Sequence, residues 1–459
     1  MTKNKNNKLD NILSLVNEFI EEKNASKKWN PGEDWVHYAG PYYDSNEYIS
    51  AVRSLLSGWL ALADDGLRFE RKFPKFLGKE SGLLTNSGSS ANLLMMSALA
   101  TKRLYNFPKG TKVLTPVAGF PTTVNPIFQV GFEPVFVDVE LPSMNLNLDQ
   151  VEKKIKEHDI KVITFAHVLG NPPNMNRLMD IVEKNNLILL EDCCDALGSS
   201  YDGQPLGSFG KMSSCSFYPA HHITLGEGGF VATPDDEHER VVRSLRDWGR
   251  GCYCVGKKAT MLKNGTCKKR FSNWLPTLPN EIFDHKYVYE EIGYNLKPIE
   301  LQAAIGLVQM NKIEEITRRR KENFSNLYKV FEKYGDLFHL PEADSKADPS
   351  WFAFPLTIKD NTLLKRDVFT NFLETNKIQT RTYFGGNFLL QPAYSHLSNP
   401  QEVVKEFPVA TKITTDTFFL GTSPVITKEQ INYIGDVVDK YMKTSIKRSL
   451  NVINRNANL

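Results

Sequence analysis

Residues 162–192 read VITFAHVLGNPPNMNRLMDIVEKNNLILLED, and both ends of this stretch are short apolar runs. Val162–Ala166 and Leu187–Leu190 are rich in aliphatic residues, and Arg177–Asn185 between them has helical spacing. Short, continuous apolar strands that alternate with helices are typical of a buried, mainly parallel sheet. The stretch therefore predicts a strand–helix–strand unit of an α/β fold.

The same alternation continues on both sides of this unit. Strands are expected at Val113–Thr115 and Pro134–Val139, and a helix at Leu148–Glu157. Downstream, Glu300–Glu332 predicts one or two long helices, Trp351–Ile358 and Thr380–Phe384 predict strands, and Lys428–Lys443 predicts a last helix. We expect an N-terminal arm (1–40, with a helix over 9–23), a large domain with a mostly parallel sheet (41–315) and a small C-terminal α+β domain (316–459).

The composition excludes several classes of protein. The chain has 459 residues, of which 41% are hydrophobic and 24% charged, which is typical of a globular protein. A net charge of +3 gives no general case for nucleic-acid binding. No apolar run reaches the ~18 residues of a membrane span, and no secretory signal is recognisable. Six cysteines are too few for a disulfide scaffold, which fits a cytoplasmic location.

A first candidate ligand site is the run Thr85–Ser90, TNSGSS, which precedes the helical run Ala91–Ala100. Small hydroxyl residues and a glycine at the start of a helix expose backbone N–H groups beside the positive end of the helix dipole. Such a turn binds anions, most often phosphate. A lone serine at this position is also a common helix N-cap, so the motif alone leaves both interpretations open.

A second candidate is the pair Glu191-Asp192, which directly follows the apolar run Leu187–Leu190. Carboxyl ends of parallel strands are where α/β proteins bind their ligands. An aspartate there can pair with a protonated pyridine nitrogen. It can equally cap the next helix.

The third motif is Ser214–Gly229, SCSFYPAHHITLGEGG. Together with Gly88-Ser89-Ser90, Phe120, Glu191-Asp192 and Gly293-Tyr294-Asn295, it resembles the DegT/DnrJ/EryC1/StrS sugar aminotransferases, over about residues 40–441. The resemblance implies the aspartate-aminotransferase-like fold (fold type I) of pyridoxal-phosphate enzymes. That family carries its cofactor-binding lysine at the position of His221, and His222 follows it.

His221 decides the expected chemistry. An imidazole cannot tether pyridoxal phosphate covalently, but it can act as a general base near neutral pH. The change from lysine to histidine resembles the hexose 3-dehydrases of this family, which use pyridoxamine phosphate. Two other interpretations stay open, an inactive aminotransferase and a histidine that merely packs in the core.

The resemblance also implies further roles in a homodimer with active sites at the subunit interface. Ser89, Ser90 and Ser216 would hold the cofactor phosphate, and Phe120 would stack on the pyridine ring. Asp192 would keep the ring nitrogen protonated. Asp195 stands where many members carry a glutamine near the ring hydroxyl. Asn295 would reach the phosphate in the neighbouring subunit.

Four cysteines form the last constellation. Cys194 and Cys252 have 57 residues between them, Cys254 follows after one residue, and Cys267 after a further 12. Four thiolates can hold a [2Fe–2S] cluster, a C-x-C pair also suits zinc, and scattered thiols are often unrelated. The spacing resembles the CDP-4-keto-6-deoxyglucose 3-dehydrases, whose last gap is shorter at seven residues. Cys193 and Cys215 are expected to be packed core residues.

The resemblance therefore implies C3 dehydration of a nucleotide-linked 4-keto-6-deoxyhexose for 3,6-dideoxyhexose synthesis. The partners that it implies are the sugar nucleotide and a flavin/iron–sulfur reductase. The segment 248–280 contains no acidic residue and seven basic ones, which indicates a solvated face or a dock for an acidic redox partner. The alternatives are a cluster-free GDP-4-keto-6-deoxymannose 3-dehydrase-like enzyme, a sugar-nucleotide aminotransferase that uses another lysine, and a non-catalytic binding protein.

Overall fold

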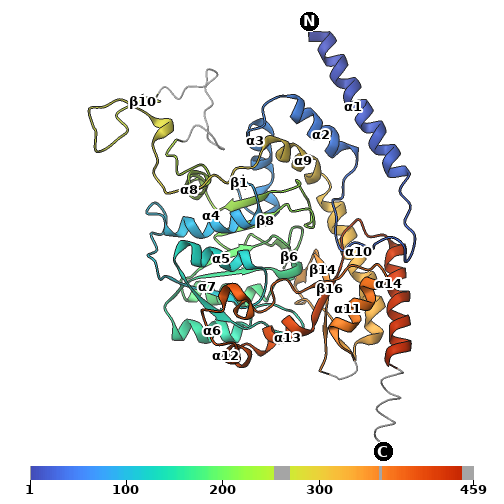
Figure 1. Ribbon diagram of the computed structural model, residues 1–459. Helices are drawn as coiled ribbons and strands as arrows, with labels where there is room; N and C mark the ends of the chain where they lie inside the picture. The colour runs from blue at the N-terminus through green and yellow to red at the C-terminus, as the bar shows by residue number, and fades with distance from the viewer. Residues whose placement is uncertain (1, 253–268, 361–363, 447–459) are drawn as a thin grey trace, which may run out of the picture.

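The computed structural model describes residues 2–252, 269–360 and 364–446 (Figure 1). Its centre is a seven-stranded sheet in the order β1-β9-β8-β5-β4-β2-β3. The strands are β1 (Ser81–Thr85), β2 (Lys112–Pro116), β3 (Glu133–Val137), β4 (Ile160–Ala166), β5 (Ile188–Asp192), β8 (Met212–Ser216) and β9 (Gly229–Thr233). Only β9 runs antiparallel to its neighbours β1 and β8, so the sheet is mixed and mostly parallel, as expected.

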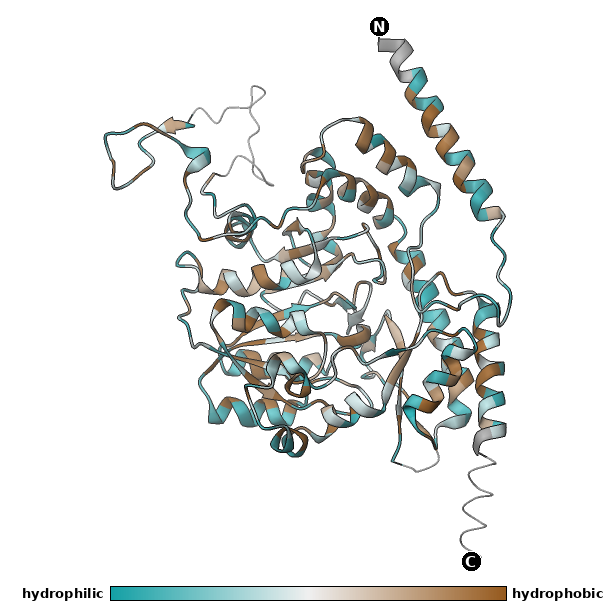
Figure 2. Ribbon diagram, viewed as in Figure 1, coloured by the Kyte–Doolittle hydropathy of each residue, from teal (hydrophilic) through white to brown (hydrophobic). Residues whose placement is uncertain are grey.

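Helices cover both faces of this sheet and bury its apolar side chains. One face packs against α4 (Gly88–Ala100), α5 (Pro121–Val130) and α8 (Asp236–Arg246). The other packs against α3 (Asp64–Lys72), α6 (Leu148–Glu157), α7 (Met175–Lys184) and α9 (Glu300–Met310). Figure 2 shows the central strands and the inward sides of the helices in hydrophobic colours. The carboxyl edge of the sheet is thereby held between two packed layers.

A second, smaller unit follows α9. Its four-stranded antiparallel sheet has the order β12-β14-β16-β15. These strands are β12 (Phe338–His339), β14 (Ala353–Ile358), β15 (Arg381–Thr382) and β16 (Thr417–Gly421). Its helices are α10 (Ile313–Phe331), α11 (Arg366–Thr375), α12 (Pro400–Glu406), α13 (Pro408–Asp416) and α14 (Lys428–Tyr441). Residues of α10, α11 and α14 form one apolar cluster with β14 and β16.

Several shorter parts complete the chain. Helix α1 (Thr2–Ala25) packs against α2 (Ser45–Leu56), which in turn packs against α9 (Figure 1). A small sheet joins β6 (Ser200–Tyr201), β7 (Gln204–Pro205) and β13 (Ala347–Asp348), and β10 (Phe271–Ser272) pairs with β11 (Phe283–Asp284). None of the described helices has an apolar stretch long enough to cross a membrane.

Two of the differences between the expected and the observed elements involve residues of the site. The strand expected at Leu187–Leu190 continues to Asp192, so this aspartate ends the strand instead of following it. The strand expected at Thr380–Phe384 shrinks to Arg381–Thr382. Phe384 has a φ of 40°, a left-handed conformation that a strand cannot contain. The helical stretch at 300–332 divides into α9 and α10, and the expected domain boundary at 315 falls in the first turn of α10.

Candidate active site

Asp192 lies at the carboxyl end of β5, and its carboxylate is fixed by donors from four segments. Asn92 Nδ2 and Thr123 Oγ1 each donate to Oδ2 at 2.7 Å. The Cys194 backbone N–H donates to Oδ1 at 3.1 Å, and the Ser214 hydroxyl donates to the same oxygen at 3.3 Å. A buried carboxylate with both oxygens hydrogen-bonded has one orientation, which is what pairing with a ring nitrogen requires.

The turn that begins α4 lies beside this carboxylate. Ser87 is the N-cap, and its hydroxyl accepts a hydrogen bond from the Ser90 backbone N–H at 3.1 Å. A Cβ added at Gly88 would lie 2.5 Å from the Ser216 Cβ and 2.9 Å from the Cys194 Sγ, so only glycine fits there. The turn therefore places Ser89, Ser90 and Ser216 in one small region. The serine cap and the anion-binding turn coexist, because the cap satisfies only one of the first N–H groups of the helix.

His221 and His222 lie in the loop between β8 and β9 and have different surroundings. The His222 ring bonds the Ser350 carbonyl through Nε2 at 2.6 Å, and the residue is buried. His221 Nε2 lies 3.9 Å from Asp195 Oδ1, and its Nδ1 is buried without a hydrogen-bond partner among the described residues. Both histidines have a buried Nδ1 without a partner among the described residues, but His222 is anchored through Nε2 to the small unit, whereas His221 Nε2 faces the Asp195 carboxylate.

Burial is the main influence on the charge of His221 and of its neighbour Asp195. It lowers the pKa of His221 to about 4, and the Arg320 guanidinium acts in the same direction, while Asp192 and the backbone at Cys194 and Ser216 oppose it. Burial, followed by the nearby Asp192 carboxylate, raises the pKa of Asp195 to about 7. An imidazole held neutral is a proton acceptor, as a general base must be.

Aromatic rings form one side of the site. Phe120 caps α5, and its side chain is half-exposed. Its ring contacts that of Phe384 at 5.8 Å between centroids; Phe384 contacts Phe352 at 6.2 Å, and Phe352 contacts His221 at 5.4 Å. The series connects the expected stacking residue to the expected base. An exposed phenyl ring at this edge suits the face of a planar cofactor.

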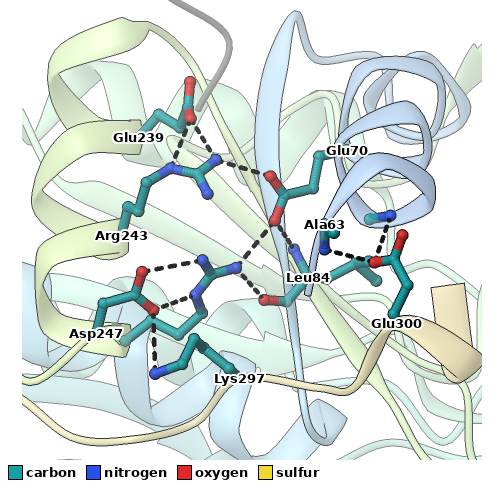
Figure 3. A network of polar contacts seen from close by, with 10 residues as sticks. Ala63, Glu70, Leu84, Glu239, Arg243, Asp247, Lys297 and Glu300 are labelled. Carbon is teal, nitrogen blue, oxygen red and sulfur yellow. Dashed lines mark hydrogen bonds and ion pairs between the residues drawn. The ribbon is translucent and has the colours of Figure 1, made fainter. Parts of the chain in front are cut away.

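Asn295 is exposed and bonds Lys297, which lies at one end of the polar network shown in Figure 3. Lys297 Nζ donates to Asn295 Oδ1 at 2.7 Å and lies 3.9 Å from an Asp247 oxygen. Arg246 bonds Asp247 and also donates to the Leu84 carbonyl at 2.8 Å, just before the Ser87–Ser90 turn. The network thus ties the Asn295 segment to the strand that carries the turn.

The cysteine set is described only in part. Cys194 and Cys252 are partly exposed free thiols, and Cys254 and Cys267 lie outside the described residues. The Cys194 Sγ lies 3.9 Å from the Ser214 hydroxyl, beside the Asp192 site. Burial raises the pKa of the Cys194 thiol well above its usual range, so a metal would have to displace its proton. Cys193 and Cys215 are buried in the core, as expected.

These residues fit a pyridoxamine phosphate. Ser89, Ser90 and Ser216 surround a helix N-terminus for the phosphate, Asp192 is fixed for the ring nitrogen, and Phe120 offers a ring face. The Nδ1 of His221 is one of the buried polar atoms without a partner among the described residues, and a group bound at this site would explain it.

Five residues of this site were not predicted from the sequence: Asn92, Thr123, Ser214, Arg320 and Phe352. The first three orient Asp192, and Arg320 bonds the His221 loop. Ser214 could have been found, because it lies in the same motif as His221. The others come from distant segments with no local signal.

Relatives of known name share most of the chain. The lipopolysaccharide biosynthesis protein RfbH of Salmonella typhimurium is 42% identical, over 94% of this chain and 97% of its own length. The dTDP-4-dehydro-2,6-dideoxy-D-glucose 3-dehydratase of Saccharopolyspora spinosa is 38% identical over 95% of this chain and 92% of its own. The GDP-4-keto-6-deoxy-D-mannose 3-dehydratase of Yersinia pseudotuberculosis is 26% identical over 88% and 98%.

Solved structures agree with the fold. An Escherichia coli GDP-4-keto-6-deoxy-D-mannose-3-dehydratase with bound hydrated PLP is 25% identical, with a TM-score of 0.73 over 87% of this chain and 98% of that one. The aminotransferase PseC of Helicobacter pylori, at 22% identity, has a TM-score of 0.74 over 90% and 100%. The fold is thus that of pyridoxal-phosphate-dependent sugar aminotransferases. Residues 42–439 match the model of the DegT/DnrJ/EryC1/StrS aminotransferase family, and the chain therefore belongs to this family.

Proposed function

We propose that this protein is a pyridoxamine-phosphate-dependent enzyme that dehydrates a nucleotide-linked 4-keto-6-deoxyhexose at C3. The observation that carries the proposal is His221 at the family's lysine position, with Nδ1 unpartnered among the described residues and Nε2 facing the Asp195 carboxylate. Relatives at 38% and 26% identity that are named 3-dehydratases support it. We propose the CDP-linked sugar as substrate, with the dTDP- and GDP-linked sugars as the alternatives to test.

The geometry supports the binding roles that the family resemblance implies. Ser89, Ser90 and Ser216 would hold the cofactor phosphate and Phe120 would cover the ring. Asp192 would keep the ring nitrogen protonated, and Asp195 would lie near the ring hydroxyl. We propose a homodimer in which the exposed Asn295 reaches the phosphate in the other subunit. We also propose that the two domains divide at residue 315 and that the protein is cytoplasmic.

The catalytic role falls to His221. When bound, the cofactor supplies an amine for the C4 ketone of the sugar and a ring that accepts electrons. His221 would take a proton at the cofactor's C4′ carbon and so assist loss of the C3 hydroxyl. Asp195, on the other side of the imidazole, would stabilise the proton that His221 has gained.

For the reductive half of the reaction, we propose a [2Fe–2S] cluster on Cys194, Cys252, Cys254 and Cys267. The support is the spacing of the four residues and the free thiols of Cys194 and Cys252. The cluster would relay electrons from a flavin/iron–sulfur reductase to complete C3 deoxygenation. The product would be a 3,6-dideoxyhexose for surface polysaccharide.

The cofactor is expected to bind reversibly, because His221 cannot tether it. Dialysis should remove it, and pyridoxamine phosphate should restore the cofactor absorption and the activity. Borohydride treatment followed by mass spectrometry should find no pyridoxyl-lysine. A pyridoxylated lysine in the site would refute the proposal and indicate an aminotransferase.

Substitution of a cluster cysteine is expected to abolish the iron–sulfur absorption of anaerobically purified protein. Cys252→Ser should lose iron and acid-labile sulfide, whereas Cys215→Ser, in the buried core, should retain both. Full iron and sulfide in Cys252→Ser would reject the cluster assignment. Retention in Cys267→Ser alone would remove only that residue, at which the spacing departs from the related pattern.

A further inference from the structure

Arg320 of α10 is a buried arginine whose hydrogen bonds, within the described part of the chain, go to backbone carbonyls. It is 1% exposed. Its NH1 donates to the Phe352 carbonyl at 3.0 Å, and its NH2 donates to the carbonyls of Ala220 and His221 at 3.3 and 3.1 Å. Among the described residues, none of its nitrogens has a carboxylate oxygen within ion-pair distance, and Nε has no hydrogen-bond partner. Burying a guanidinium without a paired carboxylate is costly, so this position requires an explanation.

These contacts belong to a closed cycle of contacts that includes His221. In this cycle, Arg320 donates to the Phe352 carbonyl, and the Phe352 N–H donates to the Leu169 carbonyl at 2.8 Å. The Leu169 N–H donates to Asp195 Oδ2 at 3.3 Å, and Asp195 Oδ1 lies 3.9 Å from His221 Nε2. The His221 carbonyl then returns to Arg320 at 3.1 Å.

One residue of this cycle, Leu169, has a strained backbone. Leu169 has a φ of 56°, the left-handed region that a leucine rarely adopts. Such a conformation persists only where surrounding contacts hold it, and here it aims the Leu169 N–H at Asp195. Arg320 supplies two of the links in this cycle, one to the Phe352 carbonyl and one to the His221 carbonyl.

We propose that Arg320 is a positioning residue that holds His221 and Asp195 in fixed register for proton transfer. The inference rests on the proposed function, since it assigns Arg320 a role through His221. Arg320 is buried and donates to backbone carbonyls, so it acts through other residues: it fixes the His221 backbone directly and Asp195 through Phe352 and Leu169. Misplacement of a catalytic group by about 1 Å costs on the order of 10²-fold in rate, so loss of these links should be visible in turnover.

The test compares Arg320→Met with the matched control Arg318→Met, whose side chain is exposed on the same helix. The enzyme, loaded with pyridoxamine phosphate, is given CDP-4-keto-6-deoxyglucose in H₂¹⁸O, and entry of ¹⁸O at C3 reports the reversible dehydration. For Arg320→Met we expect kcat to fall ~10²-fold with little change in KM or cofactor affinity. Arg320→Lys, which retains the charge and some donors, should recover part of the rate. Arg318→Met should match the wild type.

A double-mutant cycle separates positioning from a general structural role. In the His221→Asn background, Arg320→Met should cause little further loss, because the base it positions is gone. A full additional loss there, or an unchanged kcat in Arg320→Met, would overturn the inference. If Arg320→Met does not fold, Arg320→Lys carries the test, and an unchanged kcat in that variant overturns it. A wild-type enzyme that exchanges no ¹⁸O with the CDP-, dTDP- or GDP-linked sugar would instead refute the proposed function.

Discussion

His221→Asn is expected to lower the rate of C3 dehydration by ~10²–10⁴-fold, the usual contribution of a general base. Asparagine keeps the polarity and approximate size of the residue but cannot accept a proton at neutral pH. The measurement is the loss of deuterium to solvent from the C4′ carbon of deuterated pyridoxamine phosphate, with sugar substrate present. The variant should still bind the cofactor, because Asp192, Phe120 and the serines of the turn are unchanged.

His222→Asn is the matched control. Its ring bonds the Ser350 carbonyl at 2.6 Å and takes no part in the Asp195 contact, so we expect a loss of stability and a near-normal rate per folded molecule. The reverse pattern, with His222→Asn inactive and His221→Asn active, would show that the neighbouring histidine is the base.

Glu70→Ala is expected to destabilise the protein by ~3–5 kcal/mol, as removal of one partner from a buried charge network typically does. Glu70 bonds Arg243 and Arg246 at 2.9 Å each, and the three side chains are 4%, 9% and 1% exposed (Figure 3). Without it, two buried guanidinium groups lose a carboxylate. Urea unfolding of the cofactor-free protein, followed by tryptophan fluorescence, measures the change.

Glu322→Ala serves as the comparison, because its pair with Arg318 on α10 is exposed on both sides. Exposed pairs contribute ~0–1 kcal/mol, so this variant should unfold close to the wild type. Because Glu70 also accepts the Leu84 backbone N–H at 3.0 Å, Glu70→Ala should weaken cofactor binding as well, through the strand that leads into the Ser87–Ser90 turn. Equal stability of Glu70→Ala and Glu322→Ala would contradict this account of the network.

Local patterns predicted the parts of the fold that local physics determines. The apolar runs around Val162 and Leu189 are buried strands, and the predicted helix Leu148–Glu157 has those bounds in the structure. The antiparallel insertion of β9 between β1 and β8 was not predicted, because strand order is a long-range property. The conformation of Phe384, which shortens β15, likewise depends on packing that the sequence does not display.

The residues of the site divide in the same way, into those that local motifs predict and those that tertiary packing brings together. Asp192, Ser216 and His221 lie in motifs, and the structure brings them together at one edge of the sheet. Asn92 and Thr123, which orient Asp192, come from helices 100 and 69 residues earlier. Arg320 is one of three consecutive arginines in α10, and helical spacing alone does not distinguish the buried one from its exposed neighbours. Such contacts are set by tertiary packing.

Oxygen exchange at C3 tests the central claim most directly. The wild-type protein is loaded with pyridoxamine phosphate and incubated with CDP-4-keto-6-deoxyglucose in H₂¹⁸O, without reductant or amino donor, and the sugar is examined by mass spectrometry. The account predicts ¹⁸O in the C3 hydroxyl, none without cofactor, and almost none with His221→Asn. Conversion of the same sugar to a 4-amino sugar, without ¹⁸O at C3, would contradict it.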